Sequence, residues 1–350
     1  MTLPRFVPSA DFGTLSESLS ITLSDIYQTQ AYVDMDASLL EGEGVYYLDQ
    51  LADIVFLIPL VKRRIPESLS KKETYDMTSP YGYPGYYSNR LISLQELETL
   101  LHRFKDHCAQ SDIISVFLRL HPFHNNVTIG SSHFYQQIVH GETVYVDLNQ
   151  PLDVLKSGYS SNHKRNLKSL AKKGFSTSID RWHRYGEFQE VYTEAMEALG
   201  ASSFYFFGDA YFNELKRNLQ KDMHMVLVDN PEGQVVSGGL FFTHGKLAQY
   251  HLGGTREAYR SQAPSKMMFD VMIRLLKEKG IIAFHLGGGL GTRYDDLFRF
   301  KKGFSKQTVF FSTLRLITHT DKYKSLENER KNQLGTELPE GFFPAYRAMI

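Results

Sequence analysis

The residues best suited to chemistry lie between Tyr250 and Lys266, where a predicted strand leads through a polar loop into a predicted helix. Two glycines follow the strand, and the helix is expected to open at Pro264, because proline suits the first turn of a helix. Unpaired backbone N–H groups and the helix dipole at such a start favour an anionic group such as phosphate. Arg256 and Arg260 in the loop could add charge-assisted hydrogen bonds. A solvated surface loop is the alternative interpretation.

A glycine cluster and a stretch of mixed aromatic and basic residues follow the next predicted strand. Residues 287–291 read Gly-Gly-Gly-Leu-Gly, a composition that lets the backbone approach a ligand or another strand closely. The cluster is not a dinucleotide-binding fingerprint, because no helix follows at the required spacing. In residues 294–304 aromatic side chains alternate with basic ones, including Arg299 and Lys301. This stretch is expected either to grip a phosphate or polar substrate, or to form the edge of a strand.

A tyrosine-rich loop marks the first half of the chain. Residues 81–87 contain four tyrosines among two glycines and a proline. Proline stiffens such a loop and glycine opens it, while the phenol groups of Tyr81 and Tyr83 could contact a sugar or a peptide. The alternative is a well-packed surface loop.

Hydrophobic periodicity predicts strands and helices that alternate in two similarly built halves. The chain is therefore expected to be an α/β protein of two related domains that meet near residues 148–151, and not a solenoid. Strands are predicted at 45–49, 53–61, 113–120, 223–229, 235–244, 246–252, 281–286 and 307–317, and helices at 94–108, 160–173, 188–199, 211–219 and 264–279.

Several of these segments resemble one family. Residues 296–304, Asp-Leu-Phe-Arg-Phe-Lys-Lys-Gly-Phe, resemble the closing F-K-x-G-F/Y motif of the Fem-type aminoacyltransferases and the related BioF2-like (CelD-like) acetyltransferases. Both are double-module members of the GNAT acyltransferase superfamily. Residues 260–265 resemble the GNAT acyl-CoA loop Q/R-x-x-G/A-x-G/A, with Ser265 in the last place. Residues 76–85 and 119–122 resemble segments of the first module.

The resemblance, which extends from about residue 26 to residue 310, implies a fold class. We expect an α/β (α+β) protein of two GNAT-like modules, each a mixed, mostly antiparallel sheet flanked by helices. The first module would comprise residues 1–148, completed by the C-terminal segment 318–350. The second would comprise residues 149–317 and would hold the donor site.

The resemblance also implies an activity. An acyl group would pass from acyl-CoA (acetyl-CoA) to an amine on a cell-envelope precursor, an amino sugar or a peptidoglycan peptide, by direct attack without a covalent intermediate. Backbone N–H groups of a splayed strand at 248–252 would polarise the donor carbonyl. The implied residues are Lys301 and Tyr250 for catalysis, Arg256, Arg260, Ala263, Ser265 and Lys266 for the donor, and Tyr81, Tyr83, Arg119 and Arg299 for the acceptor.

Two alternatives stay open. In the first, the donor is an aminoacyl-tRNA, for which the predicted basic helix at 160–173 would supply a patch for the RNA backbone. Net neutrality and the lack of a long helical arm favour acyl-CoA instead. In the second, the chain is a binding protein that has the fold and no chemistry. The partner in the first case would be tRNA, and in every case a small-molecule or lipid-linked precursor.

Composition excludes several other classes of protein. Lys plus Arg and Asp plus Glu both number 39, so the formal net charge is zero and a basic coat for DNA is excluded. The single cysteine excludes an internal disulfide framework and a cysteine-based zinc site, and no metal is expected. The longest apolar run, 54–61, is far shorter than the roughly 20 residues that span a bilayer. With no signal peptide pattern, we expect a cytoplasmic protein. No G-x-S-x-G motif supports a hydrolase.

Overall fold

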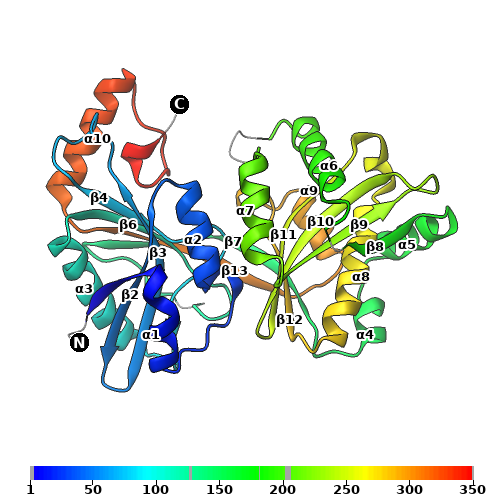
Figure 1. Ribbon diagram of the computed structural model, residues 1–350, viewed down its shortest axis with the longest axis horizontal. Coiled ribbons are helices and arrows are strands. Elements are labelled where there is room, and N and C mark those ends of the chain that lie inside the picture. The colour runs from blue at the N-terminus through cyan, green and yellow to red at the C-terminus, as the bar shows by residue number, and fades with distance from the viewer. Residues whose placement is uncertain (1–3, 126–127, 181, 202–205, 349–350) are drawn as a thin grey trace. The chain divides into compact units, whose positions relative to one another are not determined.

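The computed structural model describes residues 4–125, 128–180, 182–201 and 206–348. The chain divides into two compact units (Figure 1). The first consists of Met1–Leu23, Tyr27–His140 and Phe310–Ile350, and the second of Ser24–Ile26 and Gly141–Val309.

Two of the boundaries between the units fall inside strands β7 (Tyr135–Asp147) and β13 (Thr308–Ile317). The sequence placed them later, at 148/149 and 317/318, where these strands end. A sequence pattern changes where a strand stops, whereas compactness depends on which neighbours each half of the strand packs against. The C-terminal segment after β13 is part of the first unit.

The first unit is built on a mixed sheet. Its elements are β1 (Arg5–Pro8), α1 (Phe12–Ser18), α2 (Gln30–Leu39), β2 (Glu43–Leu51), β3 (Ile54–Arg64), β4 (Tyr75–Thr78), β5 (Tyr87–Ser88), α3 (Leu94–Gln110), β6 (Ile113–Arg119), part of β13, and α10 (Thr320–Leu334). The strand order is β1-β2-β3-β4-β6-β13, with β5 beside β3. Neighbouring strands are antiparallel except β4 and β6, which are parallel. Parallel neighbours need a crossover, which α3 supplies.

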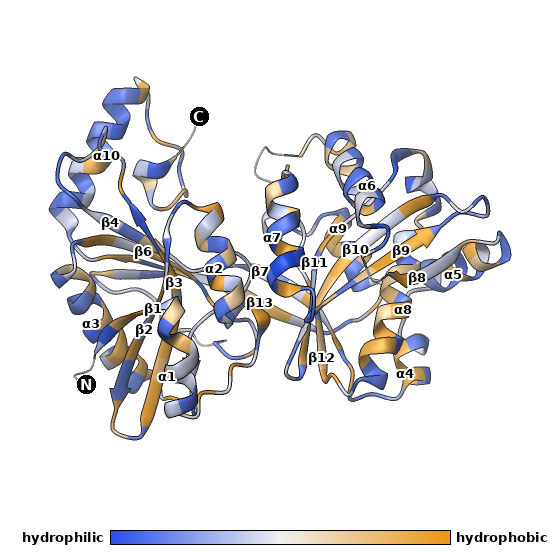
Figure 2. Ribbon diagram, viewed as in Figure 1, coloured by the Kyte–Doolittle hydropathy of each residue, from blue (hydrophilic) through white to orange (hydrophobic). Residues whose placement is uncertain are grey.

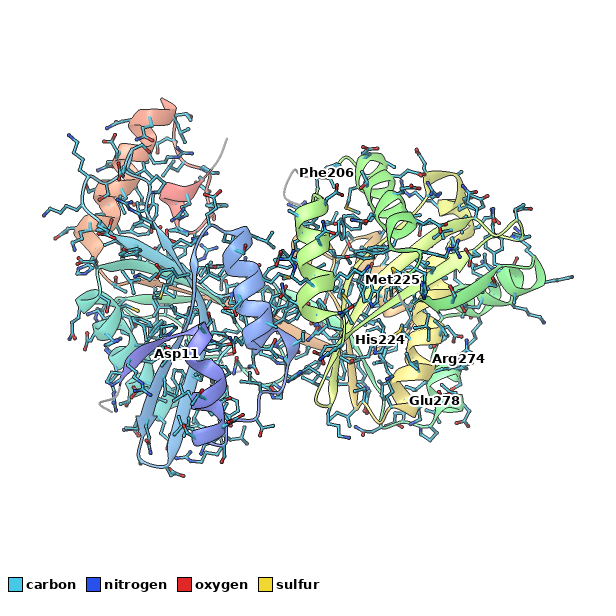
Figure 3. The ribbon with its side chains drawn as sticks, viewed as in Figure 1. Asp11, Phe206, His224, Met225, Arg274 and Glu278 are labelled. Atoms are coloured by element: carbon cyan, nitrogen blue, oxygen red, sulfur yellow. The ribbon has the colours of Figure 1, made fainter. Side chains whose placement is uncertain are left out.

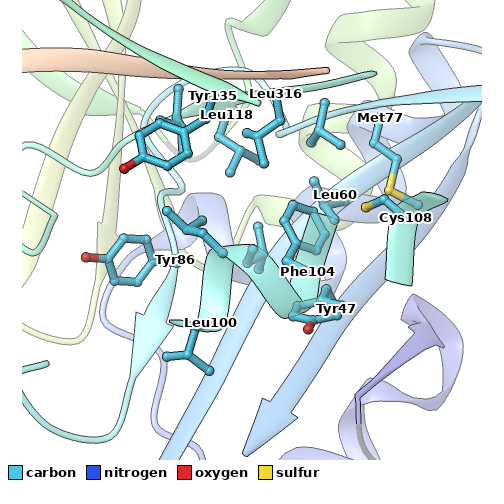
Figure 4. Packing of buried hydrophobic residues seen from close by; sticks show 14 of the residues in the cluster. Tyr47, Leu60, Met77, Tyr86, Leu100, Phe104, Cys108, Leu118, Tyr135 and Leu316 are labelled. Atoms are coloured by element: carbon cyan, nitrogen blue, oxygen red, sulfur yellow. The ribbon is translucent and has the colours of Figure 1, made fainter. Parts of the chain in front are cut away.

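Helix α3 supplies much of the core of the first unit. Its apolar residues recur at three- and four-residue spacing and are buried, as Phe104 and Cys108 illustrate. Figure 4 shows these two side chains packed with Leu100 of the same helix and with Met77 and Leu118 of the sheet. The only cysteine of the chain is therefore a core residue.

The second unit repeats this plan. Its elements are part of β7, α4 (Leu152–Ser157), α5 (Ser161–Lys172), β8 (Ser176–Asp180), α6 (Tyr185–Ala198), α7 (Asp209–Leu219), β9 (Met223–Asp229), β10 (Val235–His244), β11 (Leu247–Thr255), α8 (Ser265–Glu278), β12 (Ala283–Gly287) and α9 (Asp296–Lys302). The strand order is β7-β12-β11-β10-β9-β8. Neighbours are antiparallel except β11 and β12, which are parallel and joined by α8.

Helices cover both faces of this second sheet. On one face, Gly238 of β10 lies so close to Phe188 of α6 that a methyl group there would meet the ring at 2.8 Å. On the other, the Tyr250 ring lies 4.8 Å from the Phe269 ring of α8. Figure 2 accordingly shows apolar strands, while Arg274 and Glu278, labelled in Figure 3, lie on the exposed side of α8.

The predicted strands and helices agree with the structure apart from one segment. Residues 296–302 form helix α9, so the expectation of a strand edge at 294–304 is wrong. The Asp295 carboxylate starts the helix, because it accepts a hydrogen bond from the Phe298 N–H at 2.8 Å. Helical spacing then turns Phe298 and Lys301 toward the interior together.

Candidate active site

Strands β11 and β12 form a fork. They pair over three positions, which end at Gln249 and His285. Strand β11 continues to Thr255, and over this length its other edge stays paired with β10. In the register of the described strands, the β11 edge that faces β12 therefore has no strand partner beyond Gln249. Backbone groups on such an edge are available to a ligand.

A β-bulge lies next to the fork. Leu240 pairs with Leu252 and Phe241 pairs with Tyr250, so His251 is the extra residue of β11. A bulge bends its strand and redirects the neighbouring side chains. Gly253 completes the shape, because a methyl group there would lie 2.6 Å from the Tyr250 hydroxyl oxygen. Only glycine leaves the Tyr250 phenol this room.

Lys301 and Tyr250, the two residues predicted for catalysis, lie together beside the fork. Lys301 is only 5% exposed. Its Nζ lies 5.6 Å from the centre of the Tyr250 ring and donates a 2.6 Å hydrogen bond to the carbonyl oxygen of Gly288. Burial lowers the pKa of Lys301 to about 7, although the nearby Asp295 carboxylate acts in the opposite direction. Lys301 can therefore exchange its proton near neutral pH.

The glycine cluster positions this lysine. A side chain at Gly289 would collide with the Arg293 carbonyl oxygen and the Asp295 carboxylate, each 2.2 Å from the added carbon. The same carboxylate accepts a hydrogen bond from the Leu290 N–H at 2.8 Å. The cluster is thus a tight turn that folds the end of β12 onto the start of α9.

The start of α8 is a second part of the site. No side chain caps this helix, and Ala263 before it adopts a left-handed conformation with φ of 55°. Lys266 in its first turn is buried, and its Nζ donates to the Asn162 side-chain oxygen of α5 at 2.5 Å. Burial lowers the pKa of Lys266, and the Arg165 cation adds to this effect. The site therefore concentrates positive charge at a helix N-terminus.

Of the other predicted donor residues, Ser265 and Arg260 lie at or just before the start of α8, whereas Arg256 is bonded to other groups of the protein. Ser265 begins α8, whereas Arg260 is exposed in the short helix η4 (Glu257–Gln262) just before it. Arg256 is held elsewhere: its guanidinium donates to the Glu194 carboxylate of α6 at 2.6 Å and to the Val235 carbonyl at 2.9 Å. These bonds fasten the end of β11, and we leave Arg256 out of the proposed donor set.

Arg299 is also engaged locally. It lies on the exposed side of α9, where it pairs with Asp296 at 2.6 Å and donates to the Tyr294 carbonyl at 3.1 Å. Its role toward the acceptor stays a prediction.

Arg119, Tyr81 and Tyr83, the other predicted acceptor residues, belong to the first unit. The Arg119 guanidinium donates to the Ser79 carbonyl at 3.0 Å, and its central carbon lies 5.9 Å from the centre of the Tyr81 ring. The Tyr83 ring makes an edge contact with the Phe311 ring at 5.0 Å. Tyr81 and Arg119 are thus neighbours, and Tyr83 is packed against aromatic side chains.

Sequence reasoning missed Asp36 in this cluster. Its carboxylate accepts a hydrogen bond from the Tyr81 N–H at 3.1 Å and is buried. Burial raises the pKa of Asp36, and the Arg119 cation opposes that effect. No motif surrounds Asp36 in the sequence, so only a carboxylate on an otherwise apolar helix face could have signalled it.

In the first unit the fork that corresponds to β11 and β12 is closed. There, β4 and β6 pair as far as Thr78 and Phe117, and the chain after β4 continues the pairing. The Ser79 N–H donates to the Phe117 carbonyl at 2.7 Å, and the Arg119 N–H donates to the Ser79 hydroxyl at 2.9 Å. The N-terminus of helix α3 is capped, since Ser93 and Glu96 form a capping box there.

The described residues contain neither a metal-binding cluster nor a helix that could span a membrane. No group of three or more His, Cys, Asp or Glu side chains in this part of the chain is arranged to hold a metal ion. Within the same residues, every helix is too short or too polar to cross a membrane.

Comparison with known families matches part of the chain to an acyltransferase domain. Residues 158–302 match the family described as an acetyltransferase (GNAT) domain. This match agrees with the acyltransferase class that the sequence predicted, and the open fork and the start of α8 lie inside the matched region. Comparison with curated proteins finds no match.

Comparison with solved structures identifies the fold of the whole chain as Fem-like. The crystal structure of FemX is 14% identical, with a TM-score of 0.67, and the match covers 92% of this chain and 99% of that one. A C-terminal domain of a putative lysylphosphatidylglycerol synthetase from Agrobacterium fabrum is 12% identical, covers 92% and 97%, and has a TM-score of 0.57. A conserved protein of unknown function from Bacteroides thetaiotaomicron is 10% identical, covers 90% and 100%, and has a TM-score of 0.55. The predicted fold class is confirmed.

Proposed function

We propose that this protein transfers an acyl group from acyl-CoA, acetyl-CoA in the simplest case, to an amine of a cell-envelope precursor. The donor would lie along the open edge of β11 with its phosphates at the start of α8. Arg260, Ser265 and Lys266 would bind these phosphates together with the backbone at Ala263. A CoA donor is consistent with a reaction in the cytoplasm.

The difference between the two forks is the observation that carries the proposal. Both units contain a parallel strand pair joined by a helix, but in the first unit Ser79 fills the fork and Glu96 caps the helix with a carboxylate. In the second unit the fork is open beyond Gln249 and the first turn of the helix carries a lysine. A helix N-terminus that is uncapped and flanked by cations suits phosphate, whereas one that a carboxylate already caps does not.

The proposed chemistry is direct aminolysis of the thioester. The amine nitrogen forms a bond to the carbonyl carbon while the carbonyl electron pair moves to oxygen. Backbone N–H groups of β11 beyond Gln249 and the Lys301 ammonium would stabilise that oxyanion. The C–S bond then breaks, and the proton that the amine loses neutralises the departing thiolate. With a pKa of about 7, the Lys301 ammonium could give its own proton to the thiolate and then, as a neutral amine, take up the proton that the substrate amine loses.

The acceptor would be recognised by the first unit. Arg119 has a planar fork of donors suited to a carboxylate or phosphate of the acceptor. The Tyr81 phenol beside it, and the Tyr83 phenol of the same loop, suit a sugar or a peptide. An amino sugar or a peptidoglycan peptide, free or linked to a lipid, offers a sugar or peptide together with a carboxylate or phosphate.

One observation favours an aminoacyl-tRNA donor as a second candidate. Helix α5 exposes a row of cations next to the start of α8, and Lys266 is bonded to this helix. Such a row could follow an RNA backbone. The residues of this row are Lys164, Arg165, Lys168, Lys172 and Lys173.

The deciding experiment is to incubate the protein with each donor and a set of cell-envelope precursors and to detect products by mass spectrometry. The proposal expects an acylated precursor with acetyl-CoA or a longer acyl-CoA. If product forms only with aminoacyl-tRNA, the donor is aminoacyl-tRNA and not acyl-CoA. Calorimetry with CoA should show binding, and binding of neither donor would indicate a protein that kept the fold without the chemistry.

A further inference from the structure

Two arginines, Arg119 and Arg315, are diagonal neighbours on one face of the sheet in the first unit. Arg119 of β6 pairs with Thr313 of the antiparallel strand β13, and Arg315 lies two residues further along β13. Directly paired residues project from the same face of a sheet, and so do residues two apart on one strand. Both arginines are partly exposed, so a dissolved ligand can reach them. The proposed chemistry does not use Arg315.

Neither arginine is paired with a carboxylate in the part of the chain that the structure describes. The hydrogen bonds of the Arg119 guanidinium come from Nη1 alone, and the shorter one reaches the Ser79 carbonyl at 3.0 Å. The Arg315 guanidinium donates from Nη2 to the Gly341 carbonyl at 2.7 Å, while its Nε is buried without a partner among these residues. The Asp36 carboxylate acts on Arg119 through space but forms no ion pair with it. The two positive charges therefore lack a bonded counter-charge.

Two other arginines of the same unit show the contrast. Arg63 of β3 donates to the Asp76 carboxylate of β4 at 2.9 Å, and Arg347 near the C-terminus donates to the same carboxylate at 2.5 Å. Asp76 is fully buried, and these two cations already balance its charge. It therefore does not compensate Arg119 or Arg315.

Aromatic rings hold both guanidinium groups in place. The central carbon of the Arg119 guanidinium lies 4.9 Å from the centre of the Phe117 ring, and that of Arg315 lies 5.7 Å from the centre of the Phe343 ring. The Phe117 and Phe343 rings in turn lie 6.3 Å apart. Such contacts attract a cation without removing its charge. The two guanidinium groups are therefore fixed in position and remain able to bind an anion.

A hydroxyl and an imidazole complete the cluster. The Thr313 hydroxyl lies 2.7 Å from Nε2 of His140, a residue of β7. Burial lowers the pKa of His140, and the Arg315 and Arg119 cations lower it further. Both cations thus act on one imidazole, which is neutral at pH 7. The cluster therefore combines two arginine charges with polar groups that carry no charge.

We propose that Arg119 and Arg315 form one binding site for a phosphoryl group of the acceptor. This inference rests on the proposed function, which assigns Arg119 to the acceptor; it adds Arg315 and selects phosphate over carboxylate. Two guanidinium groups without bonded carboxylates match the two negative charges of a phosphate monoester or a diphosphate, whereas a carboxylate would leave one positive charge uncompensated. Binding such an anion would offset the desolvation of two partly buried cations.

Calorimetry with inorganic pyrophosphate tests the site. Saturating CoA is present, so that the proposed donor site is occupied. Arg119→Gln and Arg315→Gln should each weaken pyrophosphate binding by about tenfold or more, the effect of losing a hydrogen bond to a charged group. Arg64→Gln is the matched control and should bind pyrophosphate normally, since Arg64 is an exposed residue of β3 that pairs with Glu67. Arg315→Lys keeps the charge and should lose less affinity than Arg315→Gln.

Competing probes test the chemical class of the ligand. Glycylglycine, which offers a carboxylate, should displace pyrophosphate far less readily than inorganic phosphate does. Equal competition by the two would overturn the choice of phosphate over carboxylate. Uridine diphosphate and farnesyl diphosphate then separate the two sources of a diphosphate: tighter binding of the first indicates a nucleotide-linked acceptor, and tighter binding of the second a lipid-linked one.

Failure of this site is distinguishable from failure of the proposed function. Unchanged pyrophosphate affinity in Arg119→Gln and Arg315→Gln, with folding checked by circular dichroism, would overturn the site, and so would the absence of binding to the unaltered protein. If Arg315→Gln does not fold, the smaller loss expected for Arg315→Lys decides instead. If the unaltered protein binds no CoA, the proposed donor fails, while the arginine variants still decide whether this cluster binds phosphate.

Discussion

The Lys301 ammonium and the Tyr250 ring lie 5.6 Å apart, although 51 positions separate them in the chain. Lys301 also holds the Gly288 carbonyl at 2.6 Å, directly after β12 ends. One side chain therefore spans the two strands that form the open fork. This arrangement makes Lys301 the residue whose replacement tests the proposed chemistry most directly.

Replacing Lys301 with methionine should lower kcat by roughly 100- to 1,000-fold, the effect of removing one stabilising group from a developing oxyanion. Methionine keeps most of the buried volume, so the fold should persist. Steady-state kinetics and circular dichroism provide the measurements. Lys302→Met, on the same helix, is the matched control and should retain activity. Equal kcat in the two variants would remove Lys301 from the mechanism.

Lys301 should also make stability depend on pH. Its pKa is about 7 in the folded protein against 10.5 for an ordinary lysine, so the unfolded chain binds more protons between these values. The free energy of unfolding should therefore rise with pH across this window, by up to about 1.4 kcal/mol per pH unit from this group. Lys301→Met should remove this contribution and be more stable than the unaltered protein near pH 7. Urea unfolding at pH 7 and pH 9 measures the free energy of unfolding of both proteins. An equal change between the two pH values in both proteins would contradict the prediction.

Arg260→Ala should weaken CoA binding by about 1.5–3 kcal/mol, the usual range for a hydrogen bond to a charged group. Lys266→Met should have an effect in the same direction, because it removes a cation from the start of α8. Calorimetry measures both. Arg256→Gln is the control: it should lower the melting temperature, since Arg256 is bonded to Glu194, while CoA affinity stays the same. If Arg260→Ala left CoA affinity unchanged and Arg256→Gln lowered it, Arg256 and not Arg260 would belong to the donor site.

Arg119→Gln should raise KM for the acceptor by about tenfold or more and leave CoA affinity unchanged, as expected for the loss of one charge-assisted hydrogen bond. The reason is that Arg119 belongs to the first unit, whereas the proposed donor residues belong to the second. Kinetics at saturating donor, with calorimetry for CoA, separate the two effects. A change in CoA affinity without a change in acceptor KM would contradict the assignment.

The sequence by itself determined many of the local elements and the resemblance to the GNAT acyltransferases. Apolar spacing predicted helix α3, which buries Leu100 and Phe104, and turn residues predicted the meander β9-β10-β11. These signals are local, since each depends on residues a few positions apart. Residues 260–265 and 296–304 carried enough of the family pattern to predict a GNAT-like module, and residues 158–302 match the GNAT acetyltransferase domain.

Only the tertiary structure decided the surroundings of the candidate site residues. Lys301 was expected in a stretch that could have been a strand edge, and its burial on a helix instead gives it a pKa of about 7. Arg256 was expected to bind phosphate, and its partners turned out to be Glu194 and the Val235 carbonyl. Asp25 and His285 are linked through the Gln249 amide although they lie far apart in the chain, and no local pattern encodes such a contact. Protonation and hydrogen bonding depend on neighbours in space, and the chain order alone does not contain them.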